Sequence, residues 1–157
     1  MENCMKLEIS AIGENESFAR SAVAAFALPL NPTLSELSDV KTAVSEAVTN
    51  CVVHAYNTVN AKNKIIIECR VEKETRGGIL HITISDAGCG ISNVEQAQRP
   101  FFSTATSGER SGMGFTIMQT FMDELVVCSE VGQGTQVKMK KYIVGCVVEM
   151  QKERVDA

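Results

Sequence analysis

Tryptophan is absent from this sequence, and aromatic residues make up only 5% of its 157 positions. Its 15 lysines and arginines are outnumbered by 19 aspartates and glutamates, so the formal net charge is −4 at pH 7. This shortage of positive charge argues against a nucleic-acid surface, which needs a concentrated basic face. No apolar run is long enough to span a bilayer, and no signal peptide is recognisable. We therefore expect a cytoplasmic protein without a membrane segment or a direct nucleic-acid partner.

Cysteine pairs with metal-ligand spacing are also missing. Six cysteines are scattered through apolar segments without a CxxC pair, and there are only two histidines, so a structural zinc site has little support. We expect the cysteines to be reduced packing residues. With 45% hydrophobic residues, the chain suits one globular domain over residues 1–157.

The hydrophobic pattern predicts an α+β fold. Alternation over residues 5–12 predicts a strand, and helical spacing predicts a helix over 14–30 that stops near Pro29. Thr33 and Glu36 form a capping-box pattern at the start of the longest predicted helix. That helix covers 31–56, and it is followed by a hairpin (64–73 and 78–85), a long loop with at most one short helix (86–112), a helix (114–124) and a second hairpin (125–130 and 135–144). This order predicts an α/β sandwich, with a mixed sheet covered by helices on one face.

The last predicted strand carries three lysines, Lys138, Lys140 and Lys141. Lysine is a common residue on free sheet edges, where it discourages pairing with another chain. Alternation along the strand therefore predicts that these side chains face solvent or protect an edge of the sheet.

The longest predicted helix has one apolar and one polar face. Its apolar face holds Leu37, Val40, Val44, Ala47, Val48, Cys51 and Val52. On the polar face, Glu46 and Asn50 are one turn apart and direct a carboxylate and an amide oxygen toward one place. Such a pair suits a base and a Mg²⁺ ligand, because Mg²⁺ prefers oxygen and takes few protein ligands. Taken alone, the pattern is also that of an ordinary solvent-exposed face.

A second candidate motif is SDAGCGI, in which Asp86 follows a β-rich run. An ionised carboxylate only accepts hydrogen bonds, so its natural partner in a pocket is a donor such as an exocyclic amine. Gly88 and Gly90 would let a flat ring approach the backbone closely. A plain turn with an Asx hydrogen bond is the alternative for this motif.

Three glycines, Gly108, Gly112 and Gly114, precede the predicted helix over 114–124. The first amide groups of a helix are unpaired and its amino end is positive, so phosphates fit there. The segment is not a Walker loop, because no Gly-Lys-Ser or Gly-Lys-Thr follows. It is also a poor Rossmann fingerprint, because Ile117 stands where a glycine is needed. A generic glycine-rich turn is the alternative.

Together, these motifs resemble a known family. The segments EAVTN, DAGCGI and SGMGF, followed by GQGT, are similar to the N box, the two glycine boxes and the closing glycine motif of the GHKL ATP-binding superfamily. The segments ENESFAR, DVKTAVSEAVTNCVVHAY and ERSGMGFTIMQTFMDE narrow the resemblance to the anti-sigma serine kinases of sporulation, over about residues 5–145. The resemblance implies the GHKL, or Bergerat-type, ATP-binding sandwich.

The resemblance also implies roles for individual residues. Glu46 would be the general base, Asn50 the Mg²⁺ ligand and Asp86 the residue that recognises the adenine amine. The other implied ATP-binding residues are Gly88, Gly90, Ile91, Thr104, Ser107, Gly108, Arg110, Gly112, Met113, Gly114, Phe115 and Thr135. The segment 107–115 would close over the phosphates. Ala105 stands where the resemblance leads us to expect a lysine, which leaves Arg110 as the strong cation of that loop.

The implied activity is that of a serine/threonine protein kinase with Mg²⁺ and ATP, releasing ADP. It would phosphorylate a serine of an anti-anti-sigma protein of the STAS type, and it would also bind and inhibit sigma factor F. A homodimer is implied, with Arg20 near partner contacts. Positioning and charge neutralisation would supply most of the catalysis.

Other functions stay open at this stage. One is a nucleotide-gated sigma-binding module without phosphoryl transfer, and another is the equivalent kinase for a different sigma factor. An ATPase motor subunit would need a transducer domain, for which the chain has no room. An autophosphorylating histidine kinase is not expected, because His54 and His81 are the only histidines and no helical hairpin precedes the ATP-binding part.

Overall fold

The computed structural model describes residues 2–100 and 112–147. The strands are β1 (Glu2–Ser10), β2 (Lys64–Lys73), β3 (Gly78–Asp86), β4 (Glu124–Glu130) and β5 (Gly134–Ile143). The helices are α1 (Asn15–Ala27), the 3₁₀ turn η1 (Leu28–Leu30), α2 (Leu34–Asn50), the π-helix η2 (Cys51–Ala55), α3 (Val94–Ala97) and α4 (Gly114–Phe121). The predicted order of strands, helices and hairpins is thereby confirmed. The first helix ends before Pro29, as predicted, because proline cannot continue it.

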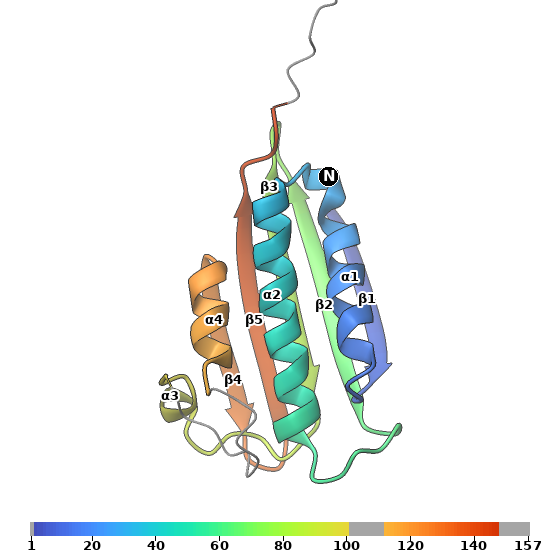
Figure 1. Cartoon of the computed structure of the whole chain (residues 1–157), viewed down its shortest axis with the longest axis vertical. Coiled ribbons are helices and arrows are strands. Elements are labelled where there is room, and N and C mark those ends of the chain that lie inside the picture. The colour runs from blue at the N-terminus through green and yellow to red at the C-terminus, as the bar shows by residue number, and fades with distance from the viewer. Residues whose placement is uncertain (1, 101–111, 148–157) are drawn as a thin grey trace, which may run out of the picture.

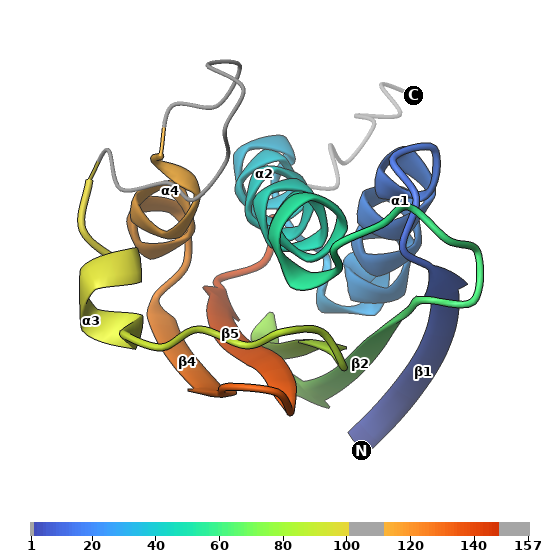
Figure 2. The ribbon, with the colours of Figure 1, turned by 90° about the horizontal axis from the view of Figure 1, so that it is seen from below.

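The helices form one layer over one face of the sheet (Figures 1 and 2). Helix α2 lies in the middle, with α1 on one side and α4 on the other, and the opposite face of the sheet is not covered by any element described. The predicted α+β sandwich with helices on one face is therefore confirmed. No helix within residues 2–100 and 112–147 combines the length and the apolar character that crossing a membrane requires.

The sheet corrects one detail of the prediction. Its strand order is β1-β2-β3-β5-β4, and all four neighbouring pairs in the described sheet are antiparallel rather than mixed. Strands β3 and β4 do run in the same direction, but β5 turns back from β4 and pairs with both of them. The hairpin partner thus occupies the place beside β3 that a parallel neighbour would need.

The core lies between α2 and the middle of the sheet. Five residues of the predicted apolar helix face are buried (Val40, Val44, Ala47, Val48 and Cys51), and Leu37 and Val52 pack against the core at its margin. The sheet contributes alternate residues of β2 and β3, including Ile65, Ile67, Leu80, Ile82 and Ile84. Each of these large side chains stabilises the fold by roughly 1.5–3 kcal/mol through its burial. This packing holds α2 firmly against the sheet.

Helix α2 begins with the predicted capping box. The Thr33 amide donates to Oε2 of Glu36 over 2.8 Å, and the Glu36 amide donates to Oγ1 of Thr33 over 3.1 Å. The second carboxylate oxygen of Glu36 accepts from the amide of Val144 over 2.9 Å. One carboxylate therefore caps the helix and also fastens it to the chain just after β5.

The prediction that all three lysines face solvent or protect a sheet edge is wrong for Lys141, and β5 is an interior strand rather than an edge. Lys138 is exposed, and Lys140 pairs with Glu124 at 2.8 Å on the open face. Lys141 lies on the helix-covered face instead, and its side chain is only 12% exposed. Alternation along the strand puts it on the same face as the buried Met139 and Ile143.

The cysteines are free, as expected, but only Cys51 and Cys69 are buried packing residues. Burial raises the pKa of the Cys69 thiol to about 12, so this group stays protonated and unreactive at neutral pH. Cys4, Cys89 and Cys128 are exposed, so the prediction that they pack in the core is wrong. Cys4 and Cys128 lie in the two edge strands and Cys89 in a loop, where the neighbouring apolar residues in the sequence do not imply burial.

We predict that Glu36→Gln destabilises the protein at neutral pH but not in acid. Although burial alone raises the pKa of Glu36, hydrogen bonds from the backbone of Thr33 and Val144 lower it overall. A carboxyl with a lowered pKa in the folded state adds stability above its unfolded pKa, and this stability is lost as the pH falls through the folded value. Glutamine keeps only one acceptor oxygen, so the expected loss is about 1 kcal/mol at pH 7.

Urea unfolding between pH 7 and acidic pH measures this difference. Ser35→Ala is the control, because Ser35 is exposed in the same helical turn. A loss for Glu36→Gln that stays constant down to the lowest pH would contradict the role given to the carboxylate.

Candidate functional site

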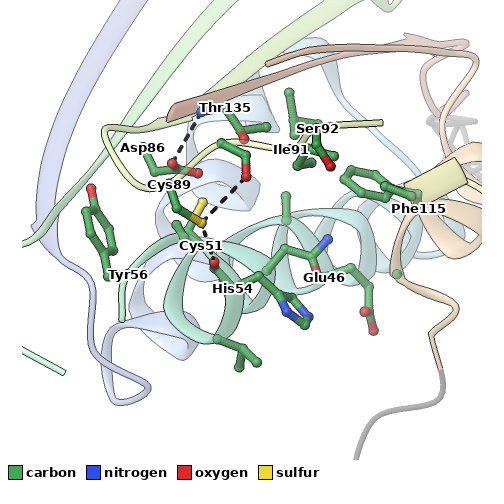
Figure 3. A pocket seen from close by; sticks show the side chains of 18 of the residues that line it. Glu46, Cys51, His54, Tyr56, Asp86, Cys89, Ile91, Ser92, Phe115 and Thr135 are labelled. Atoms are coloured by element: carbon green, nitrogen blue, oxygen red, sulfur yellow. Dashed lines mark hydrogen bonds between the residues drawn. The ribbon is translucent and has the colours of Figure 1, made fainter. Parts of the chain in front are cut away.

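A cavity of about 680 Å³ opens between the carboxyl half of α2, the loop after β3 and the start of α4 (Figure 3). These three parts are far apart in the sequence, and each carries one of the predicted motifs. The predicted site residues that line the cavity are Glu46, Asn50, Asp86, Gly90, Ile91, Gly112, Met113, Gly114, Phe115 and Thr135. The three motifs therefore meet around one space.

Helix α4 begins directly against Glu46 and Asn50. A Cβ added at Gly114 would lie 3.2 Å from both Oδ1 and Nδ2 of Asn50 and 3.3 Å from Oε2 of Glu46. A glycine at this position lets the helix start lie on both side chains, as no larger residue could without a shift. The first turn of α4, whose amides have no partner within the helix, thus lies next to a carboxylate and a carboxamide.

The oxygen atoms at this end of the cavity suit Mg²⁺. Glu46 and Asn50 supply a carboxylate and an amide oxygen, which are the ligand types that Mg²⁺ prefers. In the described part of the chain, no group of three or more His, Cys, Asp or Glu residues could hold a metal ion. A carboxylate and an amide oxygen fit an ion that takes one or two protein oxygens and is held mainly by the phosphates of a ligand.

Asp86 forms the other end of the cavity, at the end of β3 (Figure 3). Its Oδ1 accepts from the amide of Gly88 over 3.0 Å and from the amide of Thr135 over 3.2 Å. Burial raises the pKa of Asp86, while hydrogen bonds from Gly88, Cys51 and Thr135 oppose this rise. Two backbone donors fix the orientation of the carboxylate, so it can serve as an acceptor for a ligand donor.

Gly88 and Gly90 are both packed closely against protein backbone. A Cβ at Gly88 would lie 2.1 Å from the carbonyl oxygen of Ala55, and one at Gly90 would lie 2.2 Å from that of Glu130. Protein backbone therefore occupies the space on the Cβ side of both glycines. Gly90 still lines the cavity, whereas Gly88 is absent from the lining and acts through its hydrogen bond to Asp86.

The π-helix η2 holds the loop that follows Asp86. The amide of Cys89 donates to the carbonyl of Ala55 over 2.7 Å, and the thiol of Cys89 donates to the carbonyl of His54 over 3.2 Å. Wide helical turns of this kind are frequent at functional sites. The sequence prediction gave no role in the cavity to Cys89.

Tyr56 is a further residue that the sequence prediction missed. Its hydroxyl donates to the carbonyl of Lys64 over 2.6 Å and accepts from the amide of Ala87 over 3.0 Å. It thereby joins the start of β2 to the end of β3 beside Asp86. No local sequence signal marks this role, because the second partner is 31 residues away.

Ser129 organises the wall of the cavity near Thr135. Its hydroxyl accepts from the amide of Ile91 over 2.7 Å, donates to the carbonyl of Gly134 over 3.0 Å and lies 2.8 Å from Oγ1 of Thr135. Strand β4 thus fixes both the loop that follows β3 and the start of β5. A small polar residue near the end of an alternating strand was the only sequence signal for it.

Several predicted residues are not part of this cavity as described. Thr104, Ser107, Gly108 and Arg110 lie outside the described residues. Arg20 lies in α1, on the far side of α2 from α4 (Figure 2), and its Nη1 is 3.2 Å from Oε1 of Glu16. Any role of Arg20 is therefore separate from the cavity.

Comparison with known proteins places this arrangement in a family. The profile of the Histidine kinase-like ATPase domain matches residues 10–141. An anti-sigma F factor of Geobacillus sp. (strain WCH70) is 54% identical over 143 residues, which are 91% of this chain and 94% of that protein. An anti-sigma F factor of Thermoanaerobacter sp. (strain X514) is 51% identical over 141 residues, 90% of this chain and 94% of that protein. The chain belongs to the anti-sigma F factor family.

Solved structures confirm the fold of this anti-sigma F factor family member. The RsbU and RsbW domains of a Mycobacterium tuberculosis protein match with a TM-score of 0.62 and 16% identity, covering 90% of this chain and 32% of that chain. A mycobacterial sensor histidine kinase matches with a TM-score of 0.53 and 13% identity, covering 93% of this chain and 100% of that chain. The predicted GHKL fold is therefore correct, and membership of an ATPase domain family implies ATP as the ligand.

We predict that Gly88→Ala destabilises the unliganded protein. The added Cβ would lie 2.1 Å from the carbonyl oxygen of Ala55, so the loop or η2 has to move. Overpacking of this kind costs about 1–3 kcal/mol. Gly13→Ala is the control, because nothing lies within 4 Å of its added Cβ. Urea unfolding without nucleotide measures both variants, and equal stability would contradict the packing role of Gly88.

Proposed function

We propose that the chain is a Mg-ATP-dependent protein serine kinase that also binds and inhibits sigma factor F. Its substrate would be a serine of an anti-anti-sigma protein of the STAS type, and ADP would be released. The observation that carries this proposal is the convergence of Glu46, Asn50 and the start of α4 at one end of a cavity that has Asp86 at its other end. A nucleotide has the same two ends, a base and a chain of phosphates.

The base end of the nucleotide is assigned to the Asp86 side of the cavity. The carboxylate would accept from the adenine amine, in a site shaped by Gly88, Gly90, Ile91 and Thr135. An acceptor held by two backbone donors favours adenine over a base that offers a carbonyl at the same position.

The phosphates are assigned to the α4 side. The start of α4 would bind them through Gly112, Met113, Gly114 and Phe115, because its first amides are unpaired and its dipole end is positive. On the resemblance alone, we add Thr104, Ser107, Gly108 and Arg110 to this part of the site. Asn50 would hold Mg²⁺, which neutralises phosphate charge when bound.

Glu46 is assigned as the general base. Its carboxylate would accept the proton of the partner's serine hydroxyl while the serine oxygen bonds to the γ-phosphorus. The bond between the γ-phosphorus and its bridging oxygen would break, and ADP would leave with that oxygen. The position of Glu46 beside the start of α4 supports this role, because base and phosphate-binding amides are then adjacent.

The partners are assigned on the family and on the exposed surface. The similar proteins are named anti-sigma F factors, which supports sigma factor F as a partner. The anti-anti-sigma partner is assigned on the resemblance of the sequence motifs alone. Arg20 pairs with Glu16 on α1, but its side chain is 42% exposed. Its guanidinium therefore keeps N–H donors that a partner carboxylate could reach. We also propose a homodimer, a single domain over residues 1–157 and a cytoplasmic location.

We predict that Glu46→Gln retains ATP binding but loses phosphoryl transfer. Glutamine has nearly the same shape and cannot take the serine proton, so transfer should fall by about 10²–10⁴-fold while the ATP Kd changes less than about threefold. Glu95→Gln is the control, since the Glu95 side chain is 87% exposed. The assay combines labelled ATP, Mg²⁺ and the antagonist protein.

Two outcomes would contradict parts of the proposal. Full transfer by Glu46→Gln removes Glu46 as the base, and no labelled serine with the parent protein leaves only a nucleotide-gated binding module. Sigma factor F should co-purify with both proteins. Retention of a different sigma factor in its place would contradict the assigned partner.

We predict opposite effects of Asp86→Asn on binding and stability. The loss of a charged acceptor should weaken ATP binding at least about tenfold, since bonds to charged acceptors are the stronger ones. Because burial raises the pKa of Asp86, its charged form is disfavoured in the folded state. Stability is therefore lost as the pH rises through the unfolded and then the folded pKa, and the neutral variant should melt at a higher temperature at pH 7.

Thermal unfolding without nucleotide and calorimetric titration with ATP measure the two effects. Asp123→Asn is the control. The Asp123 carboxylate likewise accepts from a backbone amide, that of Tyr142, but it is exposed and lies outside the cavity. Unchanged ATP affinity in Asp86→Asn would contradict the adenine assignment.

A further inference from the structure

Lys141 is a charged residue on the face of the sheet that the helices cover. It points from β5 toward the helices, between the buried residues Met139 and Ile143 along the strand, and its side chain is only 12% exposed. A lysine is rarely buried to this extent unless it is paired, because removing its charge from water costs several kcal/mol. The partners of this ammonium group therefore define its role.

The ammonium group of Lys141 joins two helices. Its Nζ donates to Oδ2 of Asp39 in α2 over 3.1 Å and to the carbonyl oxygen of Phe121 over 2.7 Å. Phe121 is the last residue of α4, where carbonyl groups lack helical partners and the helix dipole is negative. A lysine at a helix end satisfies both conditions, so Lys141 caps α4 and links it to α2.

The contact at Lys141 and the contact at Gly114 are separated by the same number of residues along α4 and along α2. Gly114 and Phe121 are seven residues apart in α4, and Asp39 and Glu46 are seven residues apart in α2. In an α-helix that separation is about 10.5 Å. The two helices run antiparallel, so Lys141 joins Asp39, within α2, to the carboxyl end of α4, and Glu46, seven residues further along α2, lies beside the amino end of α4. A shift at one end of this short helix therefore moves the other.

A separate contact holds the carboxyl end of α4 to the sheet but not to α2. Oδ2 of Asp123 accepts from the amide of Tyr142 over 2.7 Å, and the amide of Asp123 donates to the carbonyl of Lys140 over 2.9 Å. These bonds fix the chain after α4 along β5. They leave the spacing between α4 and α2 to side-chain packing and to the Lys141 link.

We propose that Lys141 is a positioning residue of the nucleotide site, which sets the place of the first turn of α4 against Glu46 and Asn50 by fastening the last turn of α4 to Asp39. The inference rests on the proposed function, because it gives the first turn of α4 the phosphates of ATP as its ligand. Lys141 is too far along the helix to touch the nucleotide itself, so its effect is confined to the phosphate end. The adenine end, around Asp86, belongs to other elements.

The test compares Lys141→Met with Lys138→Met. Methionine keeps the apolar stem and removes the charge, and Lys138 is exposed on the opposite face of the same strand, so it controls for charge alone. Calorimetric titration measures the Kd values of adenosine, ADP and ATP. Amide hydrogen exchange of residues 114–121 without nucleotide measures the fastening of α4 independently of any ligand.

For Lys141→Met we expect the affinities for ADP and ATP to fall at least about fivefold, the adenosine affinity to stay within about twofold, and α4 exchange to be at least about fivefold faster. Lys138→Met should match the parent, and Lys141→Arg should recover part of the affinity, because arginine keeps the positive charge and several N–H donors. An equal loss for adenosine and ATP, or parental affinities throughout, would overturn the proposal.

Two further arms keep the outcomes distinct. If Lys141→Met does not fold, Asp39→Ala replaces it, because this change breaks the same link from the α2 side. It is expected to weaken ATP binding but not adenosine binding. A ratio of ATP to adenosine affinity equal to that of the parent would overturn the proposal. If the parent protein binds no ATP, the proposed function fails. The α4 exchange rates then still decide whether Lys141 fastens the helix.

Discussion

The site depends on one close contact, in which the first turn of α4 lies against the side chains of Glu46 and Asn50 without an intervening Cβ. Gly114 makes this approach possible, since an added Cβ would be only 3.2–3.3 Å from those side chains. The contact brings unpaired backbone donors beside a carboxylate and a carboxamide. The shape of this end of the cavity follows from this packing.

The remaining elements fix the position of that contact relative to Asp86. Burial of α2 against β2 and β3 fixes the face that carries Glu46 and Asn50, and the strand end of β3 fixes Asp86. Backbone contacts of Gly88 with Ala55 and of Gly90 with Glu130 then close the loop between them. One end of the cavity is thus held by backbone contacts, and the other is formed by the start of one short helix.

Periodicity and capping predicted the elements well, because they are local properties of the chain. The α2 core face and the Thr33 and Glu36 capping box are both found as expected. Pairings over long distances were not predictable: the sequence did not show that β5 lies between β3 and β4, with the helices over the face that carries Lys141. Tyr56 was missed for the same reason, since its partner is 31 residues away. The motifs meet around one cavity, and the need for glycine at position 88 comes from packing against backbone.

The central claim is that one Mg-nucleotide spans the cavity from Asp86 to the start of α4. A crystal structure of the protein with Mg²⁺ and a non-hydrolysable ATP analogue tests it most directly. The account predicts the adenine amine within hydrogen-bond distance of Asp86, the phosphates at the first amides of α4 and the ion on the amide oxygen of Asn50. An analogue bound outside the cavity, or one bound in the reverse direction with its phosphates at Asp86, would contradict it.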